Sequence, residues 1–329
     1  MLEGKSILFI SPSFFNYEKE ILKKMQGLGA NVTFYDDRPS NSVLVRGLIR
    51  LNKKILKNRI RRYYEGILQK IIATNGYDFL LLIKGETIPP EFLQQFRQRF
   101  PKCRTIMYQY DSIRNNQNAI ACFPYFDRIL SFDLSDTEQY PAIKFRPLFY
   151  IDDYKDLKQQ SPKYDYTFIG TAHSDRYNWV MNLVKENGKD NRFFTFFYCP
   201  SKILYYGRVL FDKSFKQVKK EDISFSQLNK QQVLDIVSQS RAIVDIQHPN
   251  QTGLTMRTIE ALGAGKKLVT TNRNIVKYDF YNPGNILVLD RTSSSIAPGF
   301  AQTAYTPVST MIYQKYSLEG WLNEVMDIK

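Results

Sequence analysis

Residues Thr252 to Thr271 read TGLTMRTIEALGAGKKLVTT, and this stretch indicates the kind of fold that we expect. Gly253 opens a helix that we predict from Leu254 to Leu262. A Gly-x-Gly at Gly263 to Gly265 closes this helix, and an apolar strand from Lys267 to Thr271 follows at once. A helix that leads directly into a buried strand is the repeating unit of a parallel α/β sheet.

The same alternation of short apolar runs and amphipathic stretches continues along the whole chain, and it predicts the α/β class with two Rossmann-like domains facing a cleft. Pro141 and Pro147 interrupt an irregular stretch that we interpret as the linker. We expect one domain over residues 1–150 and a second over 151–312. A C-terminal helix within 313–329 would then be able to cross back to the first domain.

The expected elements follow from this pattern. Expected strands are Ser6–Ile10, Asn31–Asp36, Asp78–Ile83, Thr105–Tyr108, Arg128–Phe132, Tyr164–Gly170, Phe193–Tyr198, Ala242–Ile246, Lys267–Thr271 and Asn285–Leu289. Expected helices are Tyr17–Leu28, Val45–Thr74, Pro90–Phe100, Ser174–Asn187, Asn229–Ser240, Leu254–Leu262 and Ser317–Met326.

The composition points to an anionic partner, because 46 Lys and Arg stand against 32 Asp and Glu in 329 residues, a formal net charge of +14. The three cysteines (Cys103, Cys122, Cys199) are odd in number and far apart, so we expect neither disulfides nor a zinc site, and a cytoplasmic protein. No apolar run is long enough to span a bilayer, and no signal region opens the chain, so any membrane contact would be peripheral.

The start of the Gly253 helix is the most informative feature for function. A helix N-terminus offers unpaired amides and a positive dipole end to a phosphate. Glu260 lies about two turns further along, where it can accept hydrogen bonds from paired ribose hydroxyls. The residues that we expect at such a ligand are Thr252, Gly253, Leu254, Thr255, Arg257 and Glu260. The alternative is a generic Rossmann helix with a well-placed glycine.

This segment, with Glu260-Ala261-Leu262 followed by Gly265, resembles the donor-binding helix of GT-B glycosyltransferases. The resemblance implies that the diphosphate of a nucleotide sugar lies at the helix start and that Glu260 holds the ribose. The related Glu-x7-Glu pattern would place its first glutamate at Thr252. This departure leaves the retaining or inverting course of the reaction open.

A looser resemblance covers most of the chain. The segments Ser11–Phe15, Lys84–Glu86, Tyr108–Ser112 and Phe168–Thr171 are similar to segments of bacterial glycosyltransferase-like proteins from cell-surface polysaccharide gene clusters, some related to spore-coat proteins. The resemblance implies a glycosyltransferase that moves a sugar from a nucleotide-sugar donor to a glycan or lipid-linked acceptor. It implies no cofactor besides the donor substrate itself.

A second group of candidates follows the first strand of the second domain, where ligands of open α/β sheets bind. Gly170, Thr171, His173 and Arg176 lie there, and Arg176 or the loop amides can face a phosphate. The Gly-x-Gly-x-x-Gly of dinucleotide-binding enzymes is missing, which disfavours a nicotinamide dehydrogenase. The alternative is that Ser174 caps the helix and Arg176 pairs at the surface.

His173 and His248 are the only histidines of the chain, and both follow strands of the second domain. We expect His248, with Gln247 and Thr252, to contact phosphate or sugar, and we also name it as a catalytic candidate. The alternative is an ordinary surface or core histidine.

In the first domain, Asp111 and Glu86 are our candidates for the catalytic base, and Lys84 or Arg38 can bind an acidic acceptor. The alternative for each carboxylate is a helix cap or an ion pair. The chain has adjacent carboxylates such as Asp36-Asp37 but no Asp-x-Asp pattern of the kind that holds a divalent ion in other glycosyltransferases. We therefore predict no metal site.

Residues 46–70 carry nine basic residues and one acidic residue, with Leu48, Leu51, Ile55 and Leu56 at helical spacing. They predict either an interfacial helix on an anionic membrane surface or a solvated helix that covers the sheet.

Two further functional classes remain for the whole protein, nucleic-acid binding and ligand binding without catalysis. The chain lacks the signatures of nucleic-acid-binding modules, so we expect no specific nucleic acid. The missing first glutamate leaves a catalytically silent, ligand-binding protein as the other alternative.

Overall fold

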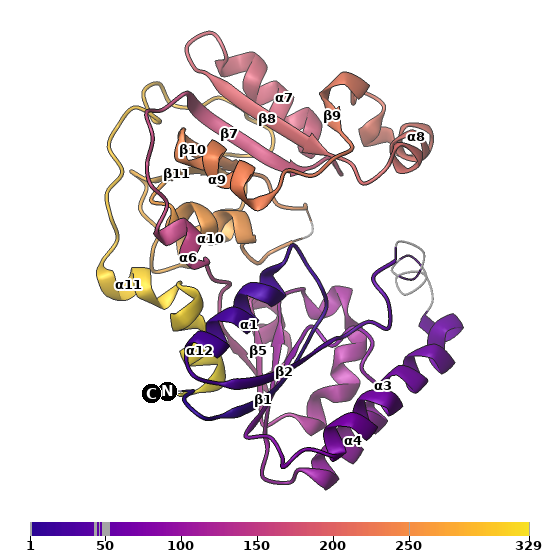
Figure 1. Ribbon diagram of the computed structural model, residues 1–329. Helices are drawn as coiled ribbons and strands as arrows, with labels where there is room; N and C mark the ends of the chain where they lie inside the picture. Colours follow the sequence, from indigo (N-terminus) through magenta and orange to yellow (C-terminus); the bar gives the residue numbers. More distant parts are fainter. Residues whose placement is uncertain (1, 43–44, 46, 48–52, 250, 329) are drawn as a thin grey trace. The chain divides into compact units, whose positions relative to one another are not determined.

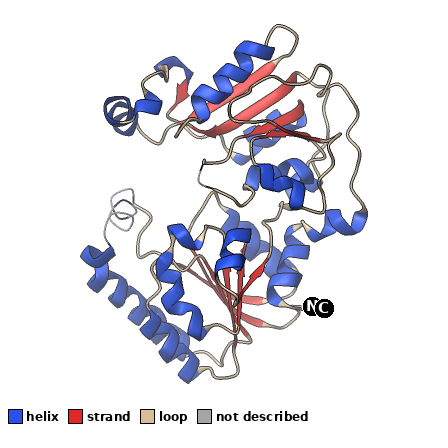
Figure 2. Ribbon diagram, turned by 180° about the vertical axis from the view of Figure 1, so that it is seen from behind, coloured by secondary structure: helices blue, strands red, loops and turns tan. Residues whose placement is uncertain are grey.

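The computed structural model describes residues 2–42, 45, 47, 53–249 and 251–328. Its contacts divide the chain into two compact units. Unit 1 comprises Met1–Pro147 and Leu318–Lys329, and unit 2 comprises Leu148–Ser317. Over the described residues, each unit contains one six-stranded sheet in which the neighbouring strands are parallel, covered by helices (Figures 1 and 2).

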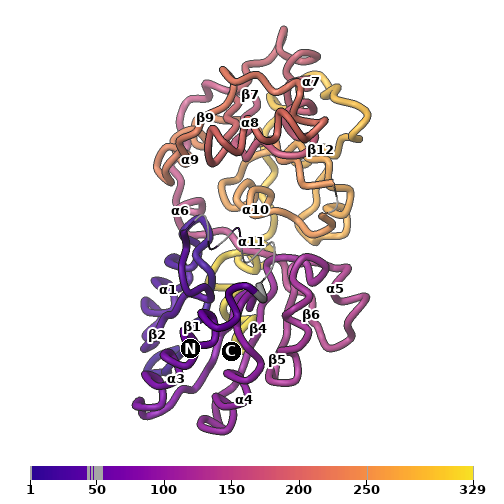
Figure 3. Tube along the Cα trace, turned by 90° about the vertical axis from the view of Figure 1, so that its right-hand side faces the viewer, coloured from indigo at the N-terminus to yellow at the C-terminus, as the bar shows by residue number. Residues whose placement is uncertain are grey.

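The sheet of unit 1 has the order β2-β1-β3-β4-β5-β6, and Figure 3 shows the strands from β2 to β6 across the unit. Its strands are β1 (Ser6–Ser11), β2 (Asn31–Asp36), β3 (Phe79–Ile83), β4 (Arg104–Gln109), β5 (Arg128–Ser131) and β6 (Ile143–Phe145). The chain first builds β2 on one side of β1 and then β3 on the other. The loops after β1 and β3 therefore diverge, which makes a topological switch point where open α/β sheets bind ligands.

The helices of unit 1 bury apolar faces on this sheet. They are α1 (Tyr17–Gly27), α3 (Lys57–Ile72), α4 (Pro90–Arg99), α5 (Leu134–Gln139) and α12 (Leu318–Met326). The face of α3 that contains Ile60, Tyr64, Ile67 and Ile71 is buried in the core, and α3 lies beside α4 (Figure 1). The C-terminal α12 belongs to this unit because Trp321 is fully buried, with its ring edge-on to Tyr108 at 4.7 Å between centroids.

The sheet of unit 2 has the order β12-β11-β10-β7-β8-β9, with its switch point between β7 and β10. Its strands are β7 (Tyr164–Thr171), β8 (Phe193–Tyr198), β9 (Ile223–Ser224), β10 (Ser240–Asp245), β11 (Lys267–Thr270) and β12 (Ile286–Val288). Its helices are α6 (Asp152–Lys155), α7 (Arg176–Asn187), α8 (Lys202–Phe211), α9 (Lys230–Ser238), α10 (Met256–Gly263) and α11 (Thr310–Lys315). Buried aromatic and branched side chains such as Phe168, Phe197 and Val244 form its core.

Most expected elements are confirmed, and three differences have physical reasons. The helix expected over Val45–Thr74 is not one continuous α-helix, because a 3₁₀ turn at Lys53–Leu56 precedes α3, which begins at Lys57. Residues 46 and 48–52 of that prediction lie outside the described residues. The supposed linker around Pro141 contains β6, which pairs with β5 at the sheet edge. The chain between β8 and α9 contains α8 and β9, for which the sequence analysis predicted no element.

Candidate functional site

Arg176 is the central feature of the switch point in unit 2. It begins α7 directly after β7, and its Nη1 donates to the Thr171 carbonyl at 3.4 Å. A Cβ added at Gly170 would lie 3.4 Å from this Nη1 and 2.7 Å from the Phe168 ring, so glycine permits the close approach. Among the described residues, the buried Nε of Arg176 has no hydrogen-bond partner. Burial lowers the pKa of Arg176, as expected for a guanidinium that lacks a full set of partners.

The two histidines come together beside Arg176. The rings of His173 and His248 lie 5.7 Å apart between centroids, and Nδ1 of His173 lies 3.0 Å from the Ser174 hydroxyl. Burial and the neighbouring Arg176 lower the pKa of His173 to about 3, so its ring is neutral near pH 7. His248 is exposed. The alternative in which Ser174 caps α7 is wrong, because Asp175 occupies the N-cap position.

The start of α10 differs from the prediction. The helix begins at Met256, with Thr255 as the N-cap whose hydroxyl accepts from the Thr258 amide at 3.3 Å, so Gly253 lies in the preceding loop. Asp245, at the end of β10, accepts hydrogen bonds from the hydroxyls of Thr255 (2.5 Å) and Thr258 (2.6 Å). Thr255 has the side-chain oxygen that a cap needs and that Gly253 lacks, which explains the later start.

Glu260 lies just over one turn into α10 rather than two, because the helix starts later than expected. Its carboxylate pairs with Nη1 of Arg257 at 2.9 Å, and its side chain is only 6% exposed. The hydroxyl of Tyr154 lies near this pair. Its burial, and then the negative charge of Glu260, raise the pKa of that hydroxyl. Arg257 and Glu260 are thus bound to each other in this structure.

Two arginines that the sequence analysis did not name complete this region. Arg291 follows β12 and bonds both the Asp175 carboxylate and the carbonyl of buried Gln247. Arg208, from α8, donates to the Ala172 carbonyl at 2.5 Å. Arg291 follows a strand end, a signal that was available in the sequence. Arg208 lies in α8, a helix that the spacing of apolar residues in the sequence did not predict.

A residue that follows β11 holds the loop before α10 in place. Asn272 donates through Nδ2 to the carbonyls of Thr252 and Gly253, each at 3.2 Å, and Leu254 is 2% exposed in the core. Carbonyl oxygens of Thr252 and Gly253 therefore face Asn272. Their role is to shape the loop that leads to the helix start.

In unit 1, the candidates from three different loops form one charged cluster, which we call the unit 1 cluster (Arg38, Lys84, Glu86, Asp111). Nε of Arg38 donates to Glu86 at 2.7 Å, and Nζ of Lys84 lies 3.4 Å from Glu86 and 3.1 Å from Asp111. The Glu86 side chain is 10% exposed, whereas that of Asp111 is 31% exposed and also accepts from Asn115 at 3.0 Å. Asp111 is thus the accessible carboxylate of this cluster.

The backbone at Lys84 is held in an unusual conformation. Lys84 and Gly85 both have left-handed φ angles, of 67° and 63°. Gln109 and Asn116 each donate a side-chain hydrogen bond to the Lys84 carbonyl, at 2.9 and 2.7 Å. A non-glycine residue in this region costs of order 1–3 kcal/mol, which surrounding contacts must offset. The turn aims the Lys84 ammonium at both carboxylates.

Comparison with known proteins relates the chain to solved structures. No family model and no curated protein matches it. The structure of HepE from Anabaena, in complex with UDP and glucose, has a TM-score of 0.64 at 9% identity and covers 98% of this chain and 98% of that chain. A glycosyltransferase from Rickettsia africae has a TM-score of 0.52 at 12% identity, covering 98% of this chain and 94% of its own.

The chain has the GT-B fold. The predicted class, α/β with two Rossmann-like domains, is confirmed, and so is the resemblance to GT-B structures. The looser resemblance to spore-coat-related proteins stays a prediction.

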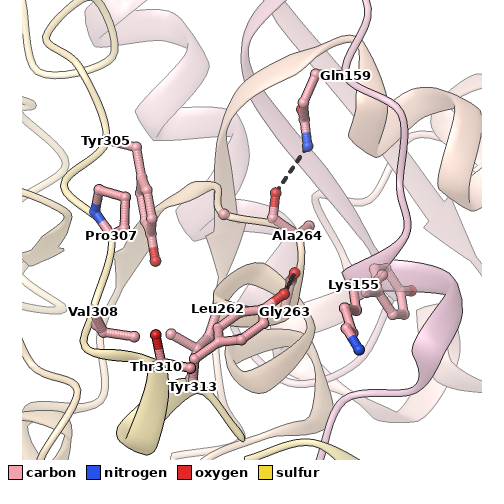
Figure 4. Close-up of a pocket in the computed structure, with 12 residues that line it drawn as sticks. Lys155, Gln159, Leu262, Gly263, Ala264, Tyr305, Pro307, Val308, Thr310 and Tyr313 are labelled. Atoms are coloured by element: carbon pink, nitrogen blue, oxygen red, sulfur yellow. Dashed lines mark hydrogen bonds between the residues drawn. The ribbon is translucent and has the colours of Figure 1, made fainter.

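A separate pocket of about 350 Å³ lies in unit 2 of the GT-B fold, at the C-terminal end of α10. Figure 4 shows Tyr305 and Pro307 on one side of it, and Gln159 bonded to the Ala264 carbonyl at 3.0 Å. Its lining includes Gly263 but none of the arginines around Arg176. Lys155 is the one charged residue in this lining.

The adjacent carboxylates of unit 1 have separate roles. Asp36 accepts from the Ser13 hydroxyl at 2.7 Å, whereas Asp37 is fully buried and accepts from the amides of Glu86 and Thr87. Burial raises the pKa of Asp37. Within the part of the chain that the structure describes, no three His, Cys, Asp or Glu side chains gather as a metal-binding group.

The basic segment 46–70 is partly described. Leu48 and Leu51 lie outside the described residues, Leu56 is buried and Ile55 is 64% exposed. The apolar face of α3 packs on the sheet, which favours the alternative of a covering helix over residues 57–72. None of the helices in the described ranges has the length and apolar character that a membrane crossing requires.

Proposed function

We propose that this chain is a glycosyltransferase that transfers a sugar from a nucleotide-sugar donor to a cell-surface glycan or lipid-linked acceptor. The observation that carries the proposal is the guanidinium of Arg176, whose buried Nε has no partner in the described residues at the switch point of unit 2. HepE, which shares the fold, has been solved with UDP and with UDP-glucose. A diphosphate would supply the missing acceptor atoms.

The donor binds to unit 2 in this proposal. Its diphosphate contacts Arg176 and the first amides of α10, whose dipole favours negative charge. The exposed His248 contacts the phosphate or sugar, whereas neutral His173 packs beside Arg176. Glu260 takes the ribose hydroxyls. Because this side chain is nearly buried and paired with Arg257, ribose binding requires that pair to reorient.

The acceptor binds to unit 1 in this proposal, at the unit 1 cluster. Asp111 removes the proton of the acceptor hydroxyl as its oxygen bonds to the anomeric carbon of the donor sugar. The bond from that carbon to the diphosphate oxygen breaks, and the diphosphate leaves with the electron pair. Glu86 is less suited as a base because both Arg38 and Lys84 already bind it. It positions Lys84 instead.

A thermal-shift screen with UDP, GDP, CMP, dTDP and their sugar conjugates tests the proposal. One nucleotide should raise the melting temperature in a saturable way, by several degrees at about 100 times its Kd. We expect the same shift with a chelator present, since arginines and a helix dipole replace a metal. A chain that responds to none of these nucleotides, or only with added divalent metal, would contradict the proposal in its present form.

A further inference from the structure

Helix α8 of unit 2 exposes an apolar face. Among the residues that the structure describes, twelve large apolar side chains are exposed, and five of them lie on the ten residues of α8. They are Ile203, Leu204, Tyr206, Leu210 and Phe211. Single exposed apolar side chains are ordinary, but a contiguous group marks an interaction surface.

The spacing of these residues places them on one side of the helix. Ile203 and Leu210 are seven residues apart, as are Leu204 and Phe211, so each pair lies on one stripe of an α-helix. Ile203 is 87% exposed, Leu210 72% and Phe211 90%. The opposite side anchors the helix, because Tyr205 is buried and its hydroxyl donates to the Val218 carbonyl at 2.9 Å.

The chain in and after α8 is rich in lysine. From Lys202 to Lys220 it has six basic residues and one acidic residue, and Glu221 and Asp222 follow. Lys220 lies over the ring of Tyr206, 5.6 Å from its centroid. The exposed lysines are Lys202, Lys213, Lys216, Lys219 and Lys220. The acidic residue, Asp212, accepts hydrogen bonds from the amide and hydroxyl of Ser214 and caps the next turn. Figures 1 and 2 show α8 at the periphery of unit 2, beside the edge strand β9.

We propose that α8 and the lysines from Lys202 to Lys220 dock unit 2 on an anionic lipid surface. Apolar side chains that protrude between cationic ones match the boundary between acyl chains and acidic headgroups, where each lysine adds electrostatic attraction. A second copy of this chain would bring like charge to these lysines, because the formal net charge of the chain is +14. This surface is distinct from residues 46–70, and its assignment does not depend on the proposed glycosyl transfer.

Co-sedimentation of the full chain with vesicles tests this inference without any activity measurement. We expect binding to phosphatidylcholine vesicles that contain phosphatidylglycerol, weak binding to pure phosphatidylcholine, and loss of binding at high salt. The double variant Leu210→Gln/Phe211→Gln should weaken binding about 100-fold, because two large apolar groups no longer enter the bilayer. The triple variant Lys213→Gln/Lys216→Gln/Lys219→Gln should weaken it at low salt.

Matched controls separate docking from folding and from other surfaces. Met311→Gln/Val276→Gln removes two exposed apolar side chains of the same unit outside α8, 77% and 52% exposed, and should bind vesicles normally. Melting temperatures of all variants should stay close to the wild type. The proposal is overturned if the α8 variants bind normally, or if only Arg61→Gln/Arg62→Gln on α3 reduces binding. It is also overturned if sedimentation velocity shows a dimer that the α8 variants dissociate, with no vesicle binding.

Discussion

The variant Arg176→Gln should bind the nucleoside diphosphate selected by the screen about 10- to 100-fold more weakly than the wild type. Charge-assisted hydrogen bonds contribute about 1.5–3 kcal/mol, and each 1.4 kcal/mol is a factor of ten in affinity. The effect is large because the buried Nε of Arg176 lacks a partner within the described residues, so the diphosphate would complete its hydrogen bonding. Isothermal titration calorimetry measures the change.

Stability should not fall in this variant. Burial disfavours the charged guanidinium, as the lowered pKa of Arg176 shows, so its removal relieves a cost in the unliganded protein. Arg192→Gln is the matched control. Arg192 belongs to the same unit but pairs with Asp165 near the start of β7, at the opposite end of the strand. If Arg176→Gln and Arg192→Gln both bind the nucleoside diphosphate as tightly as the wild type, Arg176 is not part of the donor site.

The variant Asp111→Asn should lower kcat about 10²- to 10⁴-fold, the usual contribution of a general base. Asn has nearly the same shape and keeps a side-chain oxygen for Asn115, but it cannot take a proton. Nucleotide affinity should be unchanged, because the residues that we propose for the donor site belong to unit 2. Turnover of the donor that the screen identifies, with and without acceptor, measures the effect.

Asp78→Asn is the matched control for Asp111. Asp78 also lies in unit 1 and also pairs with a lysine, Lys5 at 3.2 Å, but it precedes β3 instead of following a strand. This variant should keep wild-type turnover. If Asp111→Asn is equally active, the course is not inverting through this base. If the wild type binds the nucleotide but never turns it over, the chain is a silent ligand-binding protein.

The sequence predicts the elements well where local pattern decides. The strands Asn31–Asp36 and Phe193–Tyr198 have the predicted bounds, because short apolar or β-branched runs between turn residues leave little choice. The start of α10 was misplaced because the prediction placed the helix start at Gly253 and not at Thr255, which caps the helix and whose hydroxyl bonds Asp245 at the end of β10. Helix α8 was missed because seven of its ten residues are apolar, so its sequence shows no distinct polar face from which a helical period could be read.

The candidate site was predictable in part for a related reason. Carboxyl ends of neighbouring parallel strands meet at one edge of the sheet. Arg38, Glu86 and Asp111 each follow a strand of the same sheet, so their proximity could be predicted. The partner of each side chain was not predictable. Arg38 and Glu86 are 48 residues apart in sequence, and Arg291 and Gln247 are 44 apart. Such pairs depend on tertiary geometry, which spacing alone does not encode.

A structure of the full chain with the selected nucleoside diphosphate tests the central claim most directly. We predict a phosphate oxygen at about 2.7–3.2 Å from Nε of Arg176, with the first amides of α10 on the same diphosphate. The ribose should contact Glu260, with Arg257 turned from its present partner. A nucleotide bound elsewhere, such as in the pocket beside Gly263, with Arg176 Nε still unbonded, would contradict the account.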